Sequence, residues 1–107
     1  MASVSGSADV FGAISAPARR ALLQMLAKKE MPVLEIAESF DMTLSAVSQH
    51  LTVLRQAGLV SQRKLGKQRL YRLEPGPLRE IADWLSFYEP FWRGRLELLG
   101  QYLEENP

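Results

Sequence analysis

The chain has 107 residues, a length typical of one domain, and 47% of them are hydrophobic, which is enough for a globular core. The absence of cysteine excludes disulfides, thiolate metal ligands and thiol redox chemistry. The net charge of +1 is unevenly distributed: residues 42–73 contain six basic residues and no acid, whereas the rest of the chain sums to −5. No apolar run reaches the roughly 18 residues of a membrane span, and residues 1–7 lack signal-peptide features, so we expect a cytoplasmic protein.

The first forty residues predict three helices. After a flexible-looking start over residues 1–7, a short apolar helix is expected from about residue 8 to residue 14. Pro17 suits the first turn of a second helix, where its missing N–H is not needed, and Ser15 is a possible cap. A third helix is expected to begin near Pro32. Side chains spaced three and four residues apart predict buried stripes on the last two helices: Ala18, Leu22, Met25 and Leu26, then Val33, Ile36, Ala37 and Phe40.

A fourth helix is expected from the N-cap residue Thr43 to about Ala57, where Gly58 ends it. Val47, Leu51 and Leu54 share one face and should be buried. The opposite face has no acid and carries short or hydrogen-bonding side chains: Ser45, Ser48, Gln49, Thr52, Arg55 and Gln56. An ordinary surface helix usually carries Glu and Lys, whereas a helix that enters the major groove needs such polar groups to reach base edges and phosphates. The pattern favours a DNA-reading helix.

The hydrophobic period then changes to that of a β-hairpin. Two short strands, 60–65 and 68–73, flank Gly66-Lys67, and glycine in the first position suits a type II′ turn. Basic and polar residues concentrate at the rim of this hairpin and are expected to contact the DNA backbone or a minor groove: Arg63, Lys64, Lys67, Gln68 and Arg69. The charge pattern alone leaves a solvated basic hairpin equally open.

Residues 78–105 form a long helical segment that Pro90 should kink or split. The segment is apolar on two sides, so it needs two partners, its own domain and a second subunit. The alternative is that both sides wrap around a single monomer. The residues expected at a homodimer interface are Phe11, Ile14, Leu85, Tyr88, Trp92, Leu96 and Leu99.

Four segments in this order resemble the ArsR/SmtB winged-helix repressors: SAPARRALLQML, residues 33–37, SAVSQHLTVLRQAGLV and LGKQRLYRLEP. The resemblance covers roughly residues 8–75. It implies one mainly α domain over residues 1–107, a winged helix-turn-helix with a small β-hairpin and added terminal helices at 8–16 and 78–105 for dimerisation. It also implies a dimeric repressor that binds a palindromic operator and is released by some signal.

The chain departs from that family where its relatives bind metal. Pro32 and Leu34 stand at the places of two metal-binding cysteines, and Asp83 stands at a second family site, but the chain's only histidine is His50. One imidazole and one distant carboxylate do not make a tetrahedral site, so we expect no metal and no cofactor. Ala16 replaces an Asp that often caps the helix in relatives, which affects stability more than function.

Candidate DNA contacts on the fourth helix are Thr43, Ser45, Ser48, Gln49, His50, Thr52 and Arg55. His50 lies between the apolar and polar faces, so it either contacts phosphate or hydrogen-bonds at the edge of the core. Two further functions stay open: a winged-helix module that binds protein, and a regulator that senses a small organic ligand, of unknown identity, through the aromatic C-terminal helix. An enzyme is not expected, because there is no cysteine, no acidic partner for His50 and no glycine-rich phosphate loop.

Overall fold

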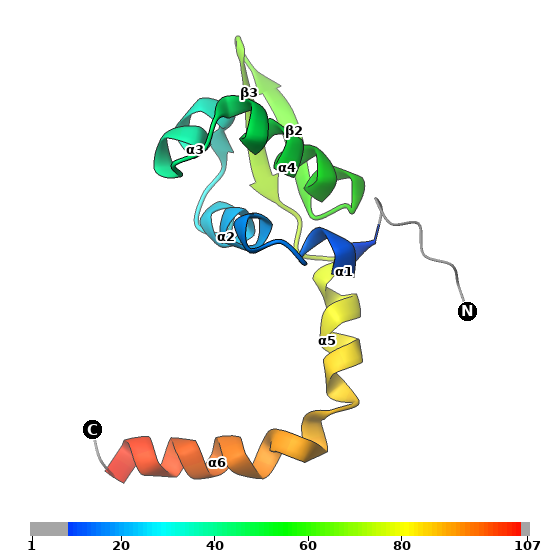
Figure 1. The fold of residues 1–107 in the computed structure, drawn as a ribbon, viewed down its shortest axis with the longest axis vertical. Helices are drawn as coiled ribbons and strands as arrows, with labels where there is room; N and C mark the ends of the chain where they lie inside the picture. Colours follow the sequence, from blue (N-terminus) through cyan, green and yellow to red (C-terminus); the bar gives the residue numbers. More distant parts are fainter. Residues whose placement is uncertain (1–8, 106–107) are drawn as a thin grey trace.

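The computed structural model describes residues 9–105 as a mainly helical fold with one small sheet (Figure 1). The elements are α1 (Val10–Ala13), α2 (Pro17–Leu26), β1 (Met31–Pro32), α3 (Val33–Ser39), α4 (Leu44–Gln56), β2 (Val60–Leu65), β3 (Gln68–Leu73), α5 (Leu78–Ser86) and α6 (Glu89–Glu105). The order confirms the predicted winged helix-turn-helix, with α3 and α4 as the helical pair and β2–β3 as the wing. Residues 1–8, where a flexible start was expected, lie outside the described residues.

The two N-terminal helices differ in how they begin. Asp9 caps α1, and its carboxylate accepts hydrogen bonds from the amides of Phe11 and Gly12, both at 3.2 Å. Pro17 starts α2 as predicted, but the proposed cap at Ser15 is wrong, because its hydroxyl donates to the Gly12 carbonyl at 2.7 Å. The N-cap is Ala16, which is extended, as a residue before proline prefers, and has no side-chain acceptor.

The sheet has a third strand that the sequence did not predict. Its order is β1-β3-β2, and β1 pairs antiparallel with β3 through Met31 opposite Tyr71 and Pro32 opposite Leu70. A two-residue strand is too short to show a hydrophobic period, and its proline is tolerated because β1 lies at the sheet edge. This strand joins the start of α3 to the wing.

The core lies where α2, α3 and α4 meet the sheet. The predicted back of α4 is confirmed, since Val47, Leu51 and Leu54 are at most 1% exposed. On α3 only Ile36 is fully buried, whereas Val33, Ala37 and Phe40 are half-buried. On α2 the buried residues are Leu22, Leu23 and Leu26, so Leu23 takes a place expected for Met25, which is half-buried.

Two glycines set the geometry of the wing. Gly58 follows α4 with φ +78°, and the amides of Gly58 and Leu59 donate to the carbonyls of Arg55 and Leu54 at 3.0 and 2.9 Å. These two bonds are a Schellman motif, which ends the helix and turns the chain into β2. Gly66 has φ +63° and Lys67 has a negative φ, as a type II′ turn requires.

The C-terminal segment is split into two helices. Pro90 lies in the first turn of α6, where its missing N–H costs nothing, and α5 ends at Ser86, four residues earlier, where the proline ring would clash with a helical carbonyl. The chain turns sharply at this break, and α6 stands apart from the rest of the fold (Figure 1). Within residues 9–105, no helix is both long and apolar enough to cross a membrane.

Candidate nucleic-acid interface

The front of α4 is an exposed polar surface. Ser45, Ser48, Gln49, Thr52, Arg55 and Gln56 are all exposed, and none of them is acidic. Thr43 caps the helix as predicted, because its hydroxyl accepts the Ala46 amide at 3.0 Å. Thr52 donates its hydroxyl to the Ser48 carbonyl at 3.0 Å, which leaves its methyl group outermost. The surface presents hydrogen-bonding groups of the kind that read base edges.

His50 lies beside this front rather than on it. The guanidinium of Arg19 is 3.3 Å from His50 Nδ1, and since arginine has only donors, Nδ1 is the acceptor. Arg19 also donates to the carbonyls of Ala13 at 2.7 Å and Gly12 at 3.3 Å. One arginine therefore ties the end of α1 to α4, and His50 takes part in that link at the edge of the core.

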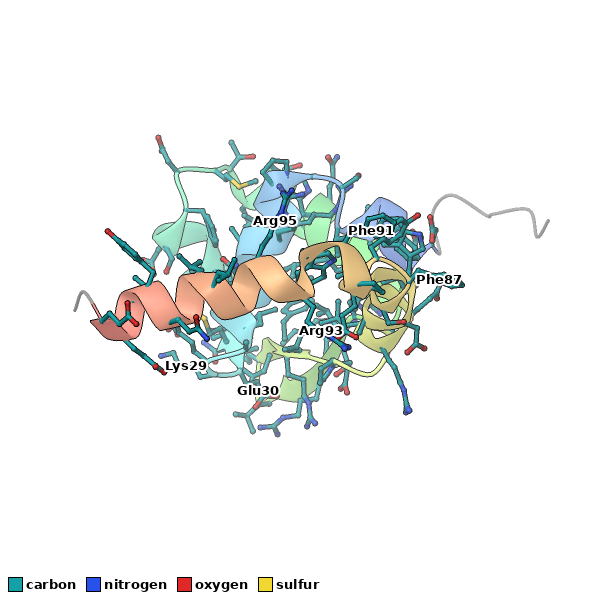
Figure 2. The ribbon with its side chains drawn as sticks, turned by 90° about the horizontal axis from the view of Figure 1, so that it is seen from below. Lys29, Glu30, Phe87, Phe91, Arg93 and Arg95 are labelled. Carbon is teal, nitrogen blue, oxygen red and sulfur yellow. The ribbon has the colours of Figure 1, made fainter. Side chains whose placement is uncertain are left out.

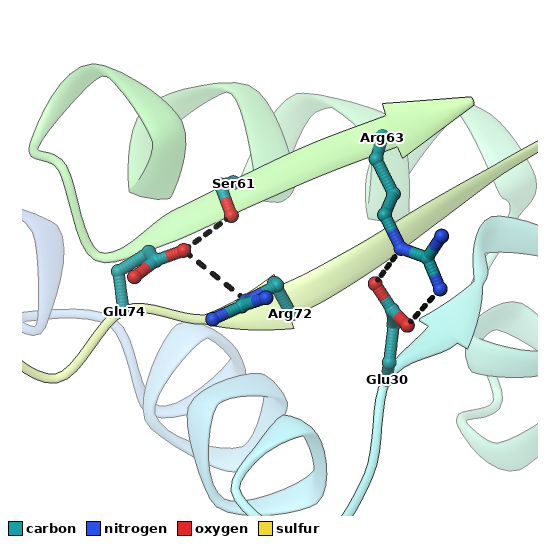
Figure 3. Close-up of polar contacts among 5 residues, drawn as sticks. All are labelled: Glu30, Ser61, Arg63, Arg72 and Glu74. Atoms are coloured by element: carbon teal, nitrogen blue, oxygen red, sulfur yellow. Dashed lines mark hydrogen bonds and ion pairs between the residues drawn. The ribbon is translucent and has the colours of Figure 1, made fainter.

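The two faces of the wing differ in charge. The register places Gln62, Lys64, Arg69 and Tyr71 on the face toward α4, and Arg63, Gln68 and Arg72 on the opposite face. On the opposite face, Arg63 donates to both carboxylate oxygens of Glu30, at 2.8 and 2.9 Å, and Arg72 pairs with Glu74 at 3.3 Å (Figure 3). Among the residues that the structure describes, Lys64, Lys67 and Arg69 make no ion pair.

The acidic partners change the charge available to an anion. The hydrogen bond from Arg63 is the main reason that the pKa of Glu30 lies below its ordinary value; partial desolvation opposes the shift, and the charges of Arg63 and Arg72 add to it. Of the six basic residues in 42–73, two are thus neutralised and four keep their charge: Arg55, Lys64, Lys67 and Arg69. These four lie on α4, on the wing face toward α4 or at the wing tip.

Sequence reasoning missed a contact between α4 and the wing. With the Gln62 amide oxygen toward Arg55, it accepts from Nη1 at 3.2 Å and Nη2 at 3.0 Å, and the amide NH₂ donates to the Tyr71 hydroxyl at 3.1 Å. The opposite amide orientation would satisfy none of these contacts, which decides the assignment. The two-residue turn sets the pairing of Gln62 with Tyr71, so the hairpin pattern could have predicted that pair, but not its contact with α4.

The residues expected at a dimer interface lie on α1, α5 and α6. Phe11 and Ile14 are half-buried, and Phe11 meets Trp84 edge to face, with ring centroids 5.6 Å apart. Leu85, Tyr88, Trp92 and Leu99 are 39–52% exposed, and the side chain of Leu96 lies outside the described part of the chain. Phe87 and Phe91, at the corner between α5 and α6, are nearly 80% exposed (Figure 2).

A polar recognition helix beside a wing that carries cations toward it defines a winged-helix DNA-binding regulator. The sequence profile of the bacterial regulatory protein arsR family matches residues 16–62. The chain is 35% identical over 77 residues to the transcriptional repressor SdpR of Bacillus subtilis, covering 72% of this chain and 86% of that protein. It is 36% identical over 86 residues to the HTH-type transcriptional regulator Rv2034 of Mycobacterium tuberculosis, covering 80% and 78%.

Solved structures agree with this assignment. A possible transcriptional regulator for arsenical resistance shares 37% identity with a TM-score of 0.65, over 92% of this chain and 96% of that one. An ArsR-like regulator from Rhodococcus sp. RHA1 shares 28% identity with a TM-score of 0.68, over 91% and 92%. The chain belongs to the ArsR family of bacterial transcriptional regulators, and it is not an enzyme.

Proposed function

We propose that this protein is a cytoplasmic repressor that binds an inverted-repeat operator as a homodimer. The observation that carries the proposal is the acid-free front of α4, which is exposed along its whole length and adjoins the wing face with unneutralised cations. A major groove admits such a helix, and the wing beside it reaches the adjacent backbone.

The work is divided between the two elements. Ser45, Ser48 and Gln49 lie in the first turns of α4, the part of a recognition helix that contacts base edges, and Gln pairs with adenine through two hydrogen bonds. Thr43 and Thr52 flank them, and His50 adds a polar edge. Lys64, Lys67 and Arg69 attract phosphates irrespective of sequence. Arg63 and Gln68 lie on the far face of the wing, so their contribution is the smaller one.

Dimerisation explains the apolar side chains of α5 and α6. A single recognition helix reads only a few base pairs, which is too little to discriminate an operator in a genome. Exposed aromatic and aliphatic groups on α5 and α6, with Phe11 and Ile14 of α1 beside them, offer a self-complementary surface to a second copy. Pairing about a twofold axis presents two copies of α4 to successive turns of one DNA face.

Small-ligand sensing through the same aromatic groups is the weaker alternative. The cavity between α5 and α6, lined by Ala82, Leu85, Ser86, Glu89 and Trp92, measures about 230 Å³. Ligand pockets usually enclose about 300 to 1,000 Å³ and bury most of the ligand. Burial against a second subunit accounts for these side chains better than a ligand does.

Sedimentation and DNA selection test the proposal together. Wild-type protein at low micromolar concentration should sediment as a dimer and should enrich an inverted repeat from a random duplex pool. Leu85→Glu should abolish the dimer and the enrichment, because it places a charge in an apolar interface, while circular dichroism shows an intact fold. A folded wild-type monomer that binds its selected DNA one-to-one would contradict the dimer, and no enrichment would contradict the operator.

A further inference from the structure

Arg55 differs from the other polar residues on the front of α4 because the wing holds it. It lies in the last turn of the helix, and its guanidinium contacts Gln62 in the middle of β2 at 3.0 and 3.2 Å. Tyr71, directly opposite Gln62 on β3, accepts the amide of Gln62 and so fixes that amide in turn. Three elements therefore determine where one guanidinium points.

The position of the Gln62 oxygen decides which donors of Arg55 remain. An arginine has five N–H donors in a rigid plane, and one oxygen in reach of both Nη1 and Nη2 occupies the end of that plane. The side edge, formed by Nε–H and an outer Nη–H, is left for another acceptor. Two parallel donors of this kind match the two oxygens of a carboxylate or a phosphate.

The surroundings of Arg55 favour a phosphate over a base. Arg55 lines an open cleft of about 520 Å³ between α4 and β2, together with Thr52, Gln56, Val60, Ser61 and Gln62. The cleft lies at the C-terminal end of α4, whereas base contacts come from the N-terminal turns of a recognition helix. Lys64 and Arg69 continue from Gln62 and Tyr71 along the same wing face, so positive charge extends from the cleft toward the wing tip.

We propose that Arg55 binds one phosphodiester of the DNA backbone in this cleft, and that Gln62 and Tyr71 are positioning residues that fix its guanidinium for that contact. The assignment rests on the proposed DNA-binding function and refines it: Arg55 supplies affinity at a fixed register, and the first turns of α4 supply sequence discrimination. Holding the guanidinium in advance spares the entropy of ordering a long side chain when DNA binds.

The first experiment uses the full chain with a duplex that wild type selects from a random pool and with a scrambled duplex of equal composition. Arg55→Gln should weaken binding to both duplexes by a similar factor, about ten- to a hundredfold for a lost charged hydrogen-bonding contact. It should also reduce the slope of log affinity against log salt by about 0.9. Loss on the selected duplex alone, with an unchanged salt slope, would identify Arg55 as a base reader and overturn the proposal.

Neutral methylphosphonate linkages, placed singly along the selected duplex, locate the contact. At one backbone position in each half-site the substitution should weaken wild type but have no further effect on Arg55→Gln. If the two losses multiply at every position, the phosphodiester contact is contradicted. A wild type that binds selected and scrambled DNA equally would instead contradict the proposed function, so the two failures are distinguishable.

The positioning role is tested at the wing. Gln62→Leu keeps the size of the side chain and removes its amide, and Tyr71→Phe removes only the hydroxyl. Both variants should retain the wild-type thermal midpoint within a few degrees, weaken DNA binding less than Arg55→Gln does, and lose the sensitivity to the same single methylphosphonate. Gln24→Ala, at an exposed site on α2, is the matched control and should behave as wild type. Full methylphosphonate sensitivity in stably folded Gln62→Leu would rule out the positioning role.

Discussion

Lys64 and Arg69 lie directly opposite each other across the β2–β3 ladder, although both side chains are positively charged. Like charges opposed in this way destabilise a sheet, and among the described residues neither side chain has an acidic partner. The opposite face of the same hairpin contains two arginines, and each of them has a carboxylate. An unrelieved cationic pair on the face toward α4 is understandable if a polyanion neutralises it.

Removal of either charge should stabilise the free protein and weaken DNA binding. Lys64→Gln and Arg69→Gln should each raise the free energy of unfolding by a few tenths of a kcal/mol, and the double variant should gain little more, because one substitution already ends the repulsion. Each should lower affinity for any duplex. Urea denaturation and titration with scrambled DNA measure both effects, and a destabilised single variant with unchanged DNA affinity would contradict this interpretation.

The ion pair of Glu30 with Arg63 should make the attachment of the wing depend on pH. Since Arg63 holds the pKa of Glu30 below its ordinary value in the folded chain, the pair stabilises the fold above the ordinary carboxylate range. That contribution is lost as the pH falls through the lowered pKa of the folded state. Nuclear magnetic resonance should show Glu30 titrating below the usual glutamate range, and Arg63→Gln should return it there.

Glu30→Gln is the matched variant for stability. Its free energy of unfolding should fall below that of wild type at neutral pH, and the difference should shrink as acid protonates Glu30. The slow hydrogen exchange of β2 amides should decrease in the variant at neutral pH. A Glu30 that titrates at its ordinary value in wild type would contradict the ion pair.

Much of the fold was predictable where the determinants are local. The cap at Thr43, the glycine that ends α4 and the two-residue turn of the wing each depend on neighbours within a few residues. The break before Pro90 follows from the same kind of local clash, and only its position, at Ser86, needed the structure. β1 was not predictable, because two residues carry no period and the strand exists only through its pairing with β3.

The candidate site was predictable in its composition but not in its electrostatics. A window of six basic residues without an acid ends just short of Glu74 and starts well after Glu30, and both carboxylates fold back onto it. The contact between Arg55 and Gln62 likewise joins a helix to a strand through tertiary packing. Side-chain pairs of this kind depend on how elements are oriented, which periodicity does not specify.

The proposed repressor should be indifferent to zinc. The chain has no cysteine and one histidine, and among the described residues no three acidic or histidine side chains gather where an ion could be held. Zinc should therefore neither bind stoichiometrically nor change DNA affinity. Calorimetry that detects one tight zinc per subunit, or a change in the affinity for the selected duplex after zinc addition, would overturn this expectation.

The division of labour between α4 and the wing is tested most directly by two alanine variants measured on two duplexes at one fixed salt concentration. Gln49→Ala should weaken binding to the selected duplex by about 1 to 3 kcal/mol, relax the base preference at one position of each half-site and leave scrambled DNA unaffected. Lys67→Ala should weaken binding to both duplexes alike, because it contacts backbone rather than bases. Equal losses of the two variants on selected and scrambled DNA would contradict the claim that the front of α4 reads sequence.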